Sequence, residues 1–548
     1  MQRSAAPDPA THFAQRTWMR AQQYLADGKI PAARAALEAL LLRQPDRFAA
    51  RMLLASVHLN EGRVREAAEQ ATLACRSLPD DAEAVATASQ CLLRIGEMTT
   101  AHDTLVRYDA RSRHLDGRHF RLLARSWHEL GENSAALALM ELAQAAGYDN
   151  ADFRYFHGLQ LQFHARTDAA RSEMRECLRQ CPTHGRAALA LARLNKHNPD
   201  PARLRFIREQ LPLVERDSED HAAFEFAQFE ELDALGGFDE AFAALQRGNA
   251  ITFARLSGGA RLDKDLFDGI RTMATRSFVD GPGLAATDGP TPIFIVGMAR
   301  SGTTLLDRML DNHPDVISTG ERTDFPLQLR WCANRHGSQI IDANLLERIP
   351  DVDFAELGRR YLEQTQWRAG GNAFYVDKLP PNHLLVGFIH RALPFAPILH
   401  MVRDPMGTCF SNYRALFGNN YPHSYNQDAL AEYYGLYRRL MQHWHDVVPD
   451  RLLDVEYRQL VGDPETTLAK VFAHCGLRSA PGCSDLTRNT STVATLSCTQ
   501  VREPLHTRGL AGWARYRTHL EPLRLALARS GISVDAAAYS DLTDHRFR

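Results

Sequence analysis

The first half of the chain carries a repeat of about 34 residues, and this period constrains its fold more than any other feature. Four glycines and one alanine stand 34, 34, 35 and 34 residues apart, at Gly28, Gly62, Gly96, Gly131 and Ala165. Five residues after each of them stands an alanine, at Ala33, Ala67, Ala101, Ala136 and Ala170. Periods of this length are typical of repeat proteins, in which each unit buries its apolar side against its neighbours.

Each repeat unit predicts two antiparallel helices. An apolar helical segment precedes each glycine, and a glycine with positive φ commonly ends a helix. The alanine five residues later lets a second helix approach the first closely, and Pro45, Pro79 and Pro182 mark where second helices end. The combination resembles the tetratricopeptide repeat (TPR); a helical bundle without repeats is the alternative. Because such arrays form extended concave surfaces, the resemblance implies a peptide or protein partner.

The helical pattern continues to about residue 280. Gly236 and Ala241 again stand five residues apart, as in one more degenerate repeat. The stretch 279–292 is rich in Gly and Pro, which predicts a domain boundary. A chain of 548 residues is long enough for at least two domains. The expected organisation is a TPR-like helical repeat domain at 1–280, a linker at 281–291 and a second domain at 292–548.

After this boundary the pattern changes to short apolar strands separated by helices. The predicted strands are 292–297, 373–377, 397–402 and 452–457. Helical patterns cover 352–367, 381–392 and 427–448. Strands that alternate with helices form a parallel sheet with helices on both faces, and ligands bind at the carboxyl ends of its strands. The whole chain is therefore expected to be an α-solenoid followed by an α/β domain.

Bulk charge and composition exclude several classes of function. The net charge is −2, so no field of the whole molecule attracts nucleic acid, and any anion site must come from a local basic cluster. We see neither an apolar leader nor a transmembrane run in the sequence, and we expect a cytoplasmic protein. Cys177, Cys181 and His184 are the nearest approach to metal-ligand spacing, and we expect buried helix positions there and no metal.

A strand, a tight loop and an amphipathic helix follow one another from Gly297 onward. The loop has the sequence GMARSGTT, in which Gly302 permits close approach of the backbone and Thr303 and Thr304 offer hydroxyls. Backbone amides of such a loop and of the helix N-terminus converge on an anion. A Walker A loop needs Lys after its last glycine, whereas this loop has its cation at Arg300. The pattern favours an oxyanion other than a Mg²⁺-bound nucleoside triphosphate.

The loop Gly297 to Thr304, with Arg300, Ser301 and Gly302 at its centre, resembles the 5′-phosphosulfate-binding loop of sulfotransferases. The helix after it leads into Asp311-Asn-His313-Pro314-Asp315-Val316, as in the tyrosylprotein sulfotransferase branch of that family. The resemblance implies a P-loop-type α/β fold with a parallel sheet. It also implies that 3′-phosphoadenylyl sulfate (PAPS) is the donor and that no metal is required.

A second element, HMVRDPMGTCFSNYR, places Arg403 at the tip of a strand and Ser411 on the helix that follows. An arginine at a strand end and a hydroxyl two helical turns later can hold one phosphate together. In sulfotransferases, an Arg and a Ser eight residues apart hold the 3′-phosphate of PAPS. The resemblance therefore assigns that role to Arg403 and Ser411.

Two further strand ends carry candidate catalytic groups. Glu321 matches the family glutamate that removes the acceptor proton, although Gly320 replaces the acidic residue that precedes it there. Lys378 matches the family lysine that stabilises the leaving group. His383 is the alternative base: cytosolic sulfotransferases use a histidine, which stands two residues after that lysine, where this chain has Pro380. The acceptor hydroxyl must lose a proton and the equatorial oxygens must be neutralised, which gives these groups, with Arg300, their chemical roles.

The C-terminal segment 497–523 resembles the part of the family that covers the nucleotide. Ser497 matches a serine near the leaving phosphate, and Tyr457 matches a tyrosine near the nucleotide. The family has Lys where Gly512 stands here, and Arg508 or Arg515 is expected to replace its charge.

The resemblance predicts PAPS-dependent transfer of a sulfuryl group to an acceptor hydroxyl. A peptide or protein tyrosine recruited by the TPR half, a carbohydrate, a lipid and a small molecule are all open as acceptors. Two other functions compete with this one: a P-loop kinase or NTPase, and an inactive TPR scaffold with a residual nucleotide fold. Arg300, Glu321, Lys378, Arg403 and Ser411 occur together, which favours an active transferase.

Overall fold

The structure is a computed structural model that describes residues 9–256, 264–489, 491–495, 505, 510 and 512–534. It contains two compact units: Met1–Tyr148 with Thr323–Trp367, and Asp149–Arg322 with Arg368–Arg548. In the described residues, no helix has both the length and the apolar content needed to cross a membrane. The compact units cut across the expected ranges 1–280, 281–291 and 292–548, which stay a prediction about sequence domains.

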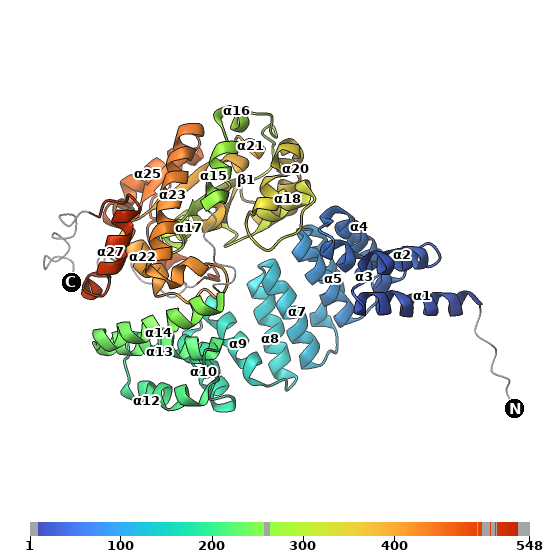
Figure 1. Cartoon of the computed structure of the whole chain (residues 1–548), viewed down its shortest axis with the longest axis horizontal. Helices are drawn as coiled ribbons and strands as arrows, with labels where there is room; N and C mark the ends of the chain where they lie inside the picture. The colour runs from blue at the N-terminus through green and yellow to red at the C-terminus, as the bar shows by residue number, and fades with distance from the viewer. Residues whose placement is uncertain are drawn as a thin grey trace. The chain divides into compact units, whose positions relative to one another are not determined.

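Helix pairs with the predicted period make up the first part of the first unit (Figure 1). They are α1 (Pro9–Ala26), α2 (Ile30–Leu41), α3 (Phe48–Asn60), α4 (Val64–Ala74), α5 (Ala82–Ile95), α6 (Met98–Tyr108), α7 (Gly117–Leu130) and α8 (Asn133–Ala145). The glycines between the members of a pair have φ values of 71°, 78°, 93° and 97°, at Gly28, Gly62, Gly96 and Gly131. The alanines of the repeat are fully buried, at Ala33, Ala67, Ala101 and Ala136. Both predictions from the repeat are confirmed: a glycine with positive φ ends the first helix of each pair, and a buried alanine lets the second helix pack closely.

The repeat geometry continues into the second unit. Its first helices are α9 (Ala151–Phe163), α10 (Thr167–Gln180), α11 (Gly185–Leu194), α12 (Pro201–Gln210), α13 (Glu219–Leu235) and α14 (Phe238–Leu256). Ala165 adopts a φ of 60° between α9 and α10, as the glycines of the series do, and Gly236 adopts 83° between α13 and α14. Ala170 and Ala241 are fully buried. The last two helices before the sheet, α15 (Lys264–Met273) and α16 (Arg276–Val279), pack against helices of the α/β region instead.

A five-stranded parallel sheet forms the α/β region of the second unit. Its strands are β1 (Thr291–Gly297), β2 (Val316–Ser318), β3 (Phe374–Lys378), β4 (Ile398–Val402) and β5 (Leu452–Glu456). Their order across the sheet is β2-β3-β1-β4-β5, and every described pairing is parallel. The predicted strands and the predicted parallel sheet are confirmed, and β1 lies in the middle of the sheet, where six of its seven residues are buried.

Helices cover both faces of this sheet. They are α17 (Thr303–Asp311), α21 (Val386–Ala392), α22 (Pro405–Tyr413), α23 (Gln427–Val447), α24 (Tyr457–Gly462), α25 (Pro464–Cys475) and α27 (Glu521–Arg529). One face of the sheet buries Leu399 and Val455 against α17 and α25. On the other face His400 of β4 contacts Tyr437 of α23, beside which α27 lies (Figure 1). The strands are thus buried on both faces between helices.

The chain leaves the second unit between β2 and β3. The segment holds α18 (Asp324–Ala333), α19 (Ala343–Leu346) and α20 (Phe354–Thr365), which belong to the first unit. Arg360 of α20 pairs with Glu97 at 2.8 Å, and the side-chain amide of Gln328 donates to the carbonyl of Gly96 at 2.7 Å. Both contacts are buried. The sequence pattern predicts the helix at 352–367 and gives no sign of where it packs.

Candidate functional site

The loop after β1 has the backbone geometry of an anion cradle. Gly297, Arg300 and Gly302 all have positive φ values, of 149°, 63° and 111°. The hydroxyl of Ser301 donates to the carbonyl of Met298 at 2.8 Å and holds the turn closed. Gly302 is the N-cap of α17, so the first amides of that helix face the loop. This is the arrangement that binds phosphate or sulfate groups at a helix N-terminus.

Gly302 is fixed in this loop by its surroundings as well as by its φ. A Cβ at this position would lie 2.5 Å from Cδ2 of Tyr457 and 3.2 Å from Cε of Met401. The ring of Tyr457 therefore packs directly against the loop backbone. The sequence resemblance placed Tyr457 near the nucleotide, and the structure puts it against the predicted binding loop.

Replacing Gly302 with alanine is expected to lower both stability and nucleotide affinity. The side chain would strain a positive-φ position, which costs about 1–3 kcal/mol, and would also displace Tyr457. Gly476→Ala is the matched control, because Gly476 has a φ of 69° and no atom within 4 Å of an added Cβ. Urea unfolding and nucleotide titration of both variants measure the two effects. Equal affinity of the two variants for nucleotide would contradict the role of the loop.

Arg403 lies at the end of β4 and reaches the same loop. One terminal guanidinium nitrogen donates to the carbonyl of Arg300 at 3.0 Å, and the guanidinium lies 4.7 Å from the ring centre of Tyr457. On α22, the side-chain amide of Asn412 donates to the carbonyl of Ala299 at 2.7 Å. Ser411, next to Asn412, is half-buried. The structure therefore brings the Arg403 and Ser411 element against the loop.

Lys378 and Glu321 form a direct ion pair. The Nζ atom of Lys378 lies 2.6 Å from Oε1 of Glu321 and 3.4 Å from the hydroxyl oxygen of Thr304. Lys378 ends β3 and pairs in register with Ile295 of β1, which places it beside the loop. Its side chain is completely buried, whereas that of Glu321 is 38% exposed. A buried cation thus connects an accessible carboxylate with the first turn of α17.

Asp307 is a buried acid near this pair that the sequence analysis did not single out. Burial raises the pKa of its carboxyl to about 6, although the charge of Lys378 acts in the opposite direction. Asp307 stands three residues after Thr304, on the same side of α17. A carboxylate one helical turn after the loop hydroxyl of Thr304 was the available signal. The charge of Lys378 therefore acts on Asp307 as well as on Glu321, its ion-pair partner.

His383, the alternative base, lies in a closed environment. Its Nδ1 is 3.2 Å from the carbonyl of Gly297 and 3.0 Å from that of Pro380, and its Nε2 is 3.2 Å from the hydroxyl of Tyr433. Burial lowers the pKa of the ring to about 4. The neutral ring therefore donates from Nδ1 and accepts from Tyr433, so both nitrogens are engaged within the protein.

Family models match both the α/β region and the repeat region of this chain. The model of the sulfotransferase family matches residues 292–481, and a model of the tetratricopeptide repeat matches residues 19–82. Residues 292–481 form a sulfotransferase domain. The domain follows a TPR region, as the sequence resemblance predicted. The matched range begins at β1 and includes the loop, Glu321, Lys378, Arg403 and Ser411.

Three relatives show how far the similarity extends. An uncharacterised protein of Aquifex aeolicus is 24% identical over 53% of this chain and 39% of its own length. A protein-tyrosine sulfotransferase of Drosophila melanogaster is 29% identical over 33% of this chain and 37% of its own. The omega-hydroxy-beta-dihydromenaquinone-9 sulfotransferase Stf3 of Mycobacterium bovis is 26% identical over 34% of this chain and 63% of its own length. The chain thus spans between about two fifths and two thirds of the length of these relatives.

Two predicted site residues of the C-terminal segment, Ser497 and Arg508, lie outside the described residues. Arg515, the other expected replacement for the charge at Gly512, donates to Asp233 of α13 at 2.9 Å. The hydroxyl of Tyr516 donates to the same carboxylate at 2.6 Å. The C-terminal segment of the sulfotransferase domain is therefore attached to a helix of the repeat type.

One described group near the sulfotransferase sheet has the composition of a metal site. His400, His445 and Asp454 each offer a ligand atom, all within 4.8 Å of one another. Both imidazoles lie at hydrogen-bond distance from one carboxylate oxygen, at 2.7 and 2.8 Å.

Cys177 is buried within α10 as expected, whereas Cys181 is the partly exposed C-cap of that helix. The expectation that the reaction needs no metal stays a prediction.

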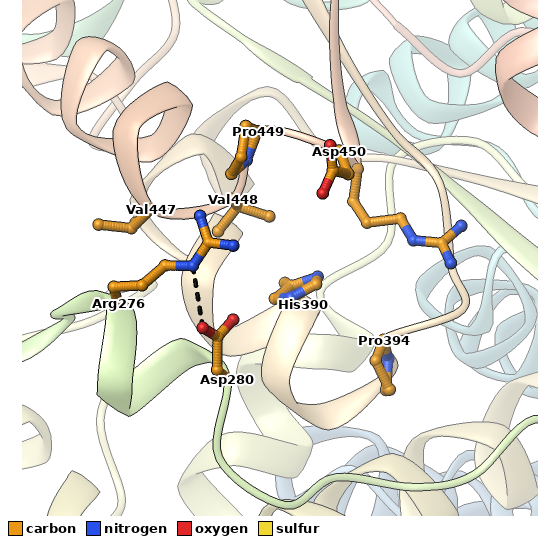
Figure 2. A pocket seen from close by; sticks show the side chains of 9 residues that line it. Arg276, Asp280, His390, Pro394, Val447, Val448, Pro449 and Asp450 are labelled. Atoms are coloured by element: carbon orange, nitrogen blue, oxygen red, sulfur yellow. Dashed lines mark hydrogen bonds and ion pairs between the residues drawn. The ribbon is translucent and has the colours of Figure 1, made fainter.

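A surface pocket lies away from the predicted site (Figure 2). It is lined by Arg276, Asp280, His390, Pro394 and residues 447–451, and Figure 2 shows the ion pair between Arg276 and Asp280. Arg451 immediately precedes β5 and Pro394 lies four residues before β4, so the pocket lies at the amino ends of these strands. Ligands of open α/β sheets bind at the opposite, carboxyl ends. This pocket is therefore not the donor site.

Proposed function

We propose that the sulfotransferase domain transfers a sulfuryl group from PAPS to an acceptor hydroxyl. The observation that carries this proposal is the contact of buried Lys378 with both Glu321 and Thr304. It joins a candidate base to the first turn of the anion-binding helix. The carboxylate of Glu321 is accessible at the carboxyl edge of the sheet, where ligands of this fold bind.

The residues support a single displacement at sulfur. Glu321 accepts the proton of the acceptor hydroxyl, and the acceptor oxygen forms a bond to the sulfur of PAPS. The bond from sulfur to the bridging oxygen breaks, and that oxygen leaves with its electron pair on the 5′-phosphate. Lys378 stabilises the charge that develops there, and the products are the sulfate ester and adenosine 3′,5′-bisphosphate.

The donor would lie along the carboxyl edge of the sheet. The loop amides from Ser301 to Thr304 and the guanidinium of Arg300 would bind the phosphosulfate, and Arg403 and Ser411 the 3′-phosphate. Burial, together with the charges of Arg193, Arg414 and Arg403, lowers the pKa of Arg300 to about 10. A bound anion would stabilise its charged form.

A thermal shift measurement tests the donor class. Adenosine 3′,5′-bisphosphate at 100 times its Kd should stabilise the protein by about 2.7 kcal/mol. ADP with Mg²⁺ should give a clearly smaller shift, because it lacks the 3′-phosphate that Arg403 and Ser411 would bind. Equal shifts with the two nucleotides would favour a kinase or NTPase. No shift with either would favour an inactive scaffold.

An aromatic acceptor is favoured by the surroundings of Glu321. Burial and the charge of Glu321 together raise the pKa of Tyr421, which is half-buried near that carboxylate. The ring of Phe417 lies against Tyr421 with their centres 4.7 Å apart. Aromatic side chains beside a base would orient a phenol ring. We therefore propose a peptide or protein tyrosine as the first acceptor to test, with the TPR region as the binding surface of its carrier protein.

The acceptor is tested with labelled PAPS and the full-length chain. Tyrosine peptides should accept label, whereas matched phenylalanine peptides should not. Labelling of an aliphatic alcohol or a carbohydrate in place of the tyrosine peptides would leave the sulfotransferase proposal standing and overturn its acceptor.

A further inference from the structure

A basic side chain of a repeat-type helix, that of Arg193, lies near enough to Arg300 of the donor loop for its charge to lower the pKa of Arg300. Nε of Arg193, on α11, lies 3.3 Å from one carboxylate oxygen of Glu230, on α13. The other oxygen of Glu230 lies 3.2 Å from a terminal nitrogen of Arg414, the residue that follows α22. Glu230 is 6% exposed, so these charges are largely shielded from water. Arg193 and Arg414 therefore share one buried carboxylate.

Arg414 connects this group with the donor loop. It stands three residues after Ser411, at a spacing that brings side chains to one side of a helix. Asn412, two residues earlier, holds the same helix against the loop through the carbonyl of Ala299. Arg403 in turn donates to the carbonyl of Arg300. Contacts therefore run without a break from α11 to the loop.

Positive charge predominates in this group. Its described cationic members are Arg193, Lys196, Arg300, Arg403, Arg414 and Arg515. Carboxylates of the described residues that contact them are Glu230, Asp233 and Asp404. The charge of Arg414 and burial lower the pKa of Lys196. Burial contributes most to the lowered pKa of Arg300, followed by the charge of Arg193. Buried cations that repel one another are stabilised by a bound anion.

The strand order shows on which side of the donor loop this basic group lies. Glu321 follows β2 and Lys378 ends β3, on one side of β1. Arg403 follows β4, on the other side of β1, and α22 with Ser411 comes directly after it. The Arg193 group joins the loop through α22, so it lies on the β4 side. The sulfuryl group and the 3′-phosphate would therefore occupy opposite sides of the loop.

We propose that Arg193 binds the 3′-phosphate of the donor, so that a repeat-type helix supplies part of the nucleotide site. The inference rests on the proposed function and adds a residue from outside the sulfotransferase match. A guanidinium can donate two parallel hydrogen bonds to a phosphate dianion. Arg193 is 23% exposed in its side chain, so it is open to a ligand as well as paired with Glu230.

Calorimetric titration of the full-length chain with two nucleotides tests this assignment. Adenosine 3′,5′-bisphosphate and adenosine 5′-phosphate differ only in the 3′-phosphate. Arg193→Gln should weaken bisphosphate binding by about 10- to 100-fold, the usual effect of losing a charged hydrogen-bond donor. Binding of adenosine 5′-phosphate should stay within about twofold of the wild type. The ratio of the two affinities is measured on the same folded molecules, so partial unfolding of a variant does not alter it.

Arg203→Gln is the matched control. Arg203 forms the same type of pair with another carboxylate of α13, Glu231, at 2.7 Å. This variant should retain the wild-type ratio of affinities. An unchanged ratio in Arg193→Gln would overturn the assignment of Arg193 and leave the proposed function standing. Failure of the wild-type chain to prefer the bisphosphate would instead overturn the proposed function.

Discussion

Replacing Glu321 with glutamine should lower sulfuryl transfer by about 10²- to 10⁴-fold, the range that a positioned general base contributes. The amide keeps the size of the side chain and can still accept a hydrogen bond from Lys378, but it cannot take up a proton. Because Glu321 contacts Lys378 and not the binding loop itself, donor affinity should change little. Single-turnover transfer from labelled PAPS measures the chemical step, and titration with adenosine 3′,5′-bisphosphate measures the binding step.

Glu456→Gln is the control for this experiment. Glu456 ends β5 at the same edge of the sheet, is exposed and contacts Gln459. Its replacement should leave transfer unchanged. Full activity of Glu321→Gln would move the role of base to His383. That histidine would then have to exchange the hydrogen bonds that it makes with Gly297, Pro380 and Tyr433.

Replacing Lys378 with methionine should lower the rate of transfer by about 10²- to 10³-fold, the usual loss when one group that stabilises developing charge is removed. Methionine fills much of the space of the lysine stem in this fully buried position without its charge. The charge on the bridging oxygen appears only as the bond to sulfur breaks. The loss should therefore fall mainly on the rate of a single turnover and less on donor affinity.

The double variant shows whether Lys378 and Glu321 act together. If the lysine positions the carboxylate as well as stabilising the leaving group, the double variant should be much less impaired than the product of the two single losses. Fully multiplicative losses would show that the ion pair has no part in positioning. A Lys378→Met variant that transfers at the wild-type rate would exclude the lysine from the chemistry.

Local patterns made much of this fold predictable. The positive φ of Gly28 and its equivalents follows from the need to end one helix and begin the next within a few residues. The strands follow from short apolar runs, and the observed bounds of β1 and β4 differ from the expected ones by a single residue. These features depend on neighbours in the sequence, which a periodic pattern reports directly.

Contacts between distant parts of the chain were not predictable in this way. Arg193 and Glu230 meet Arg414 across about 200 residues, and nothing in the local pattern of α11 distinguishes Arg193 from other surface arginines. The packing of α20 against the first repeats was unpredictable for the same reason. The pairing of Lys378 with Glu321 was also not foreseen, although both residues were chosen as candidates. Sequence resemblance identified the groups, and the fold determined their partners.

The excursion of residues 323–367 into the first unit also affects how the chain can fold during synthesis. Arg360 and Glu97 are 263 residues apart, so the first unit lacks part of its interior until most of the polypeptide has left the ribosome. The second unit is interrupted by the same segment and is finished later still. A fragment cut at the Gly- and Pro-rich stretch 279–292 would leave both units incomplete. In the second unit, helices that pack on the sheet keep apolar faces exposed until β3 to β5 have been synthesised, and this sets the order of assembly.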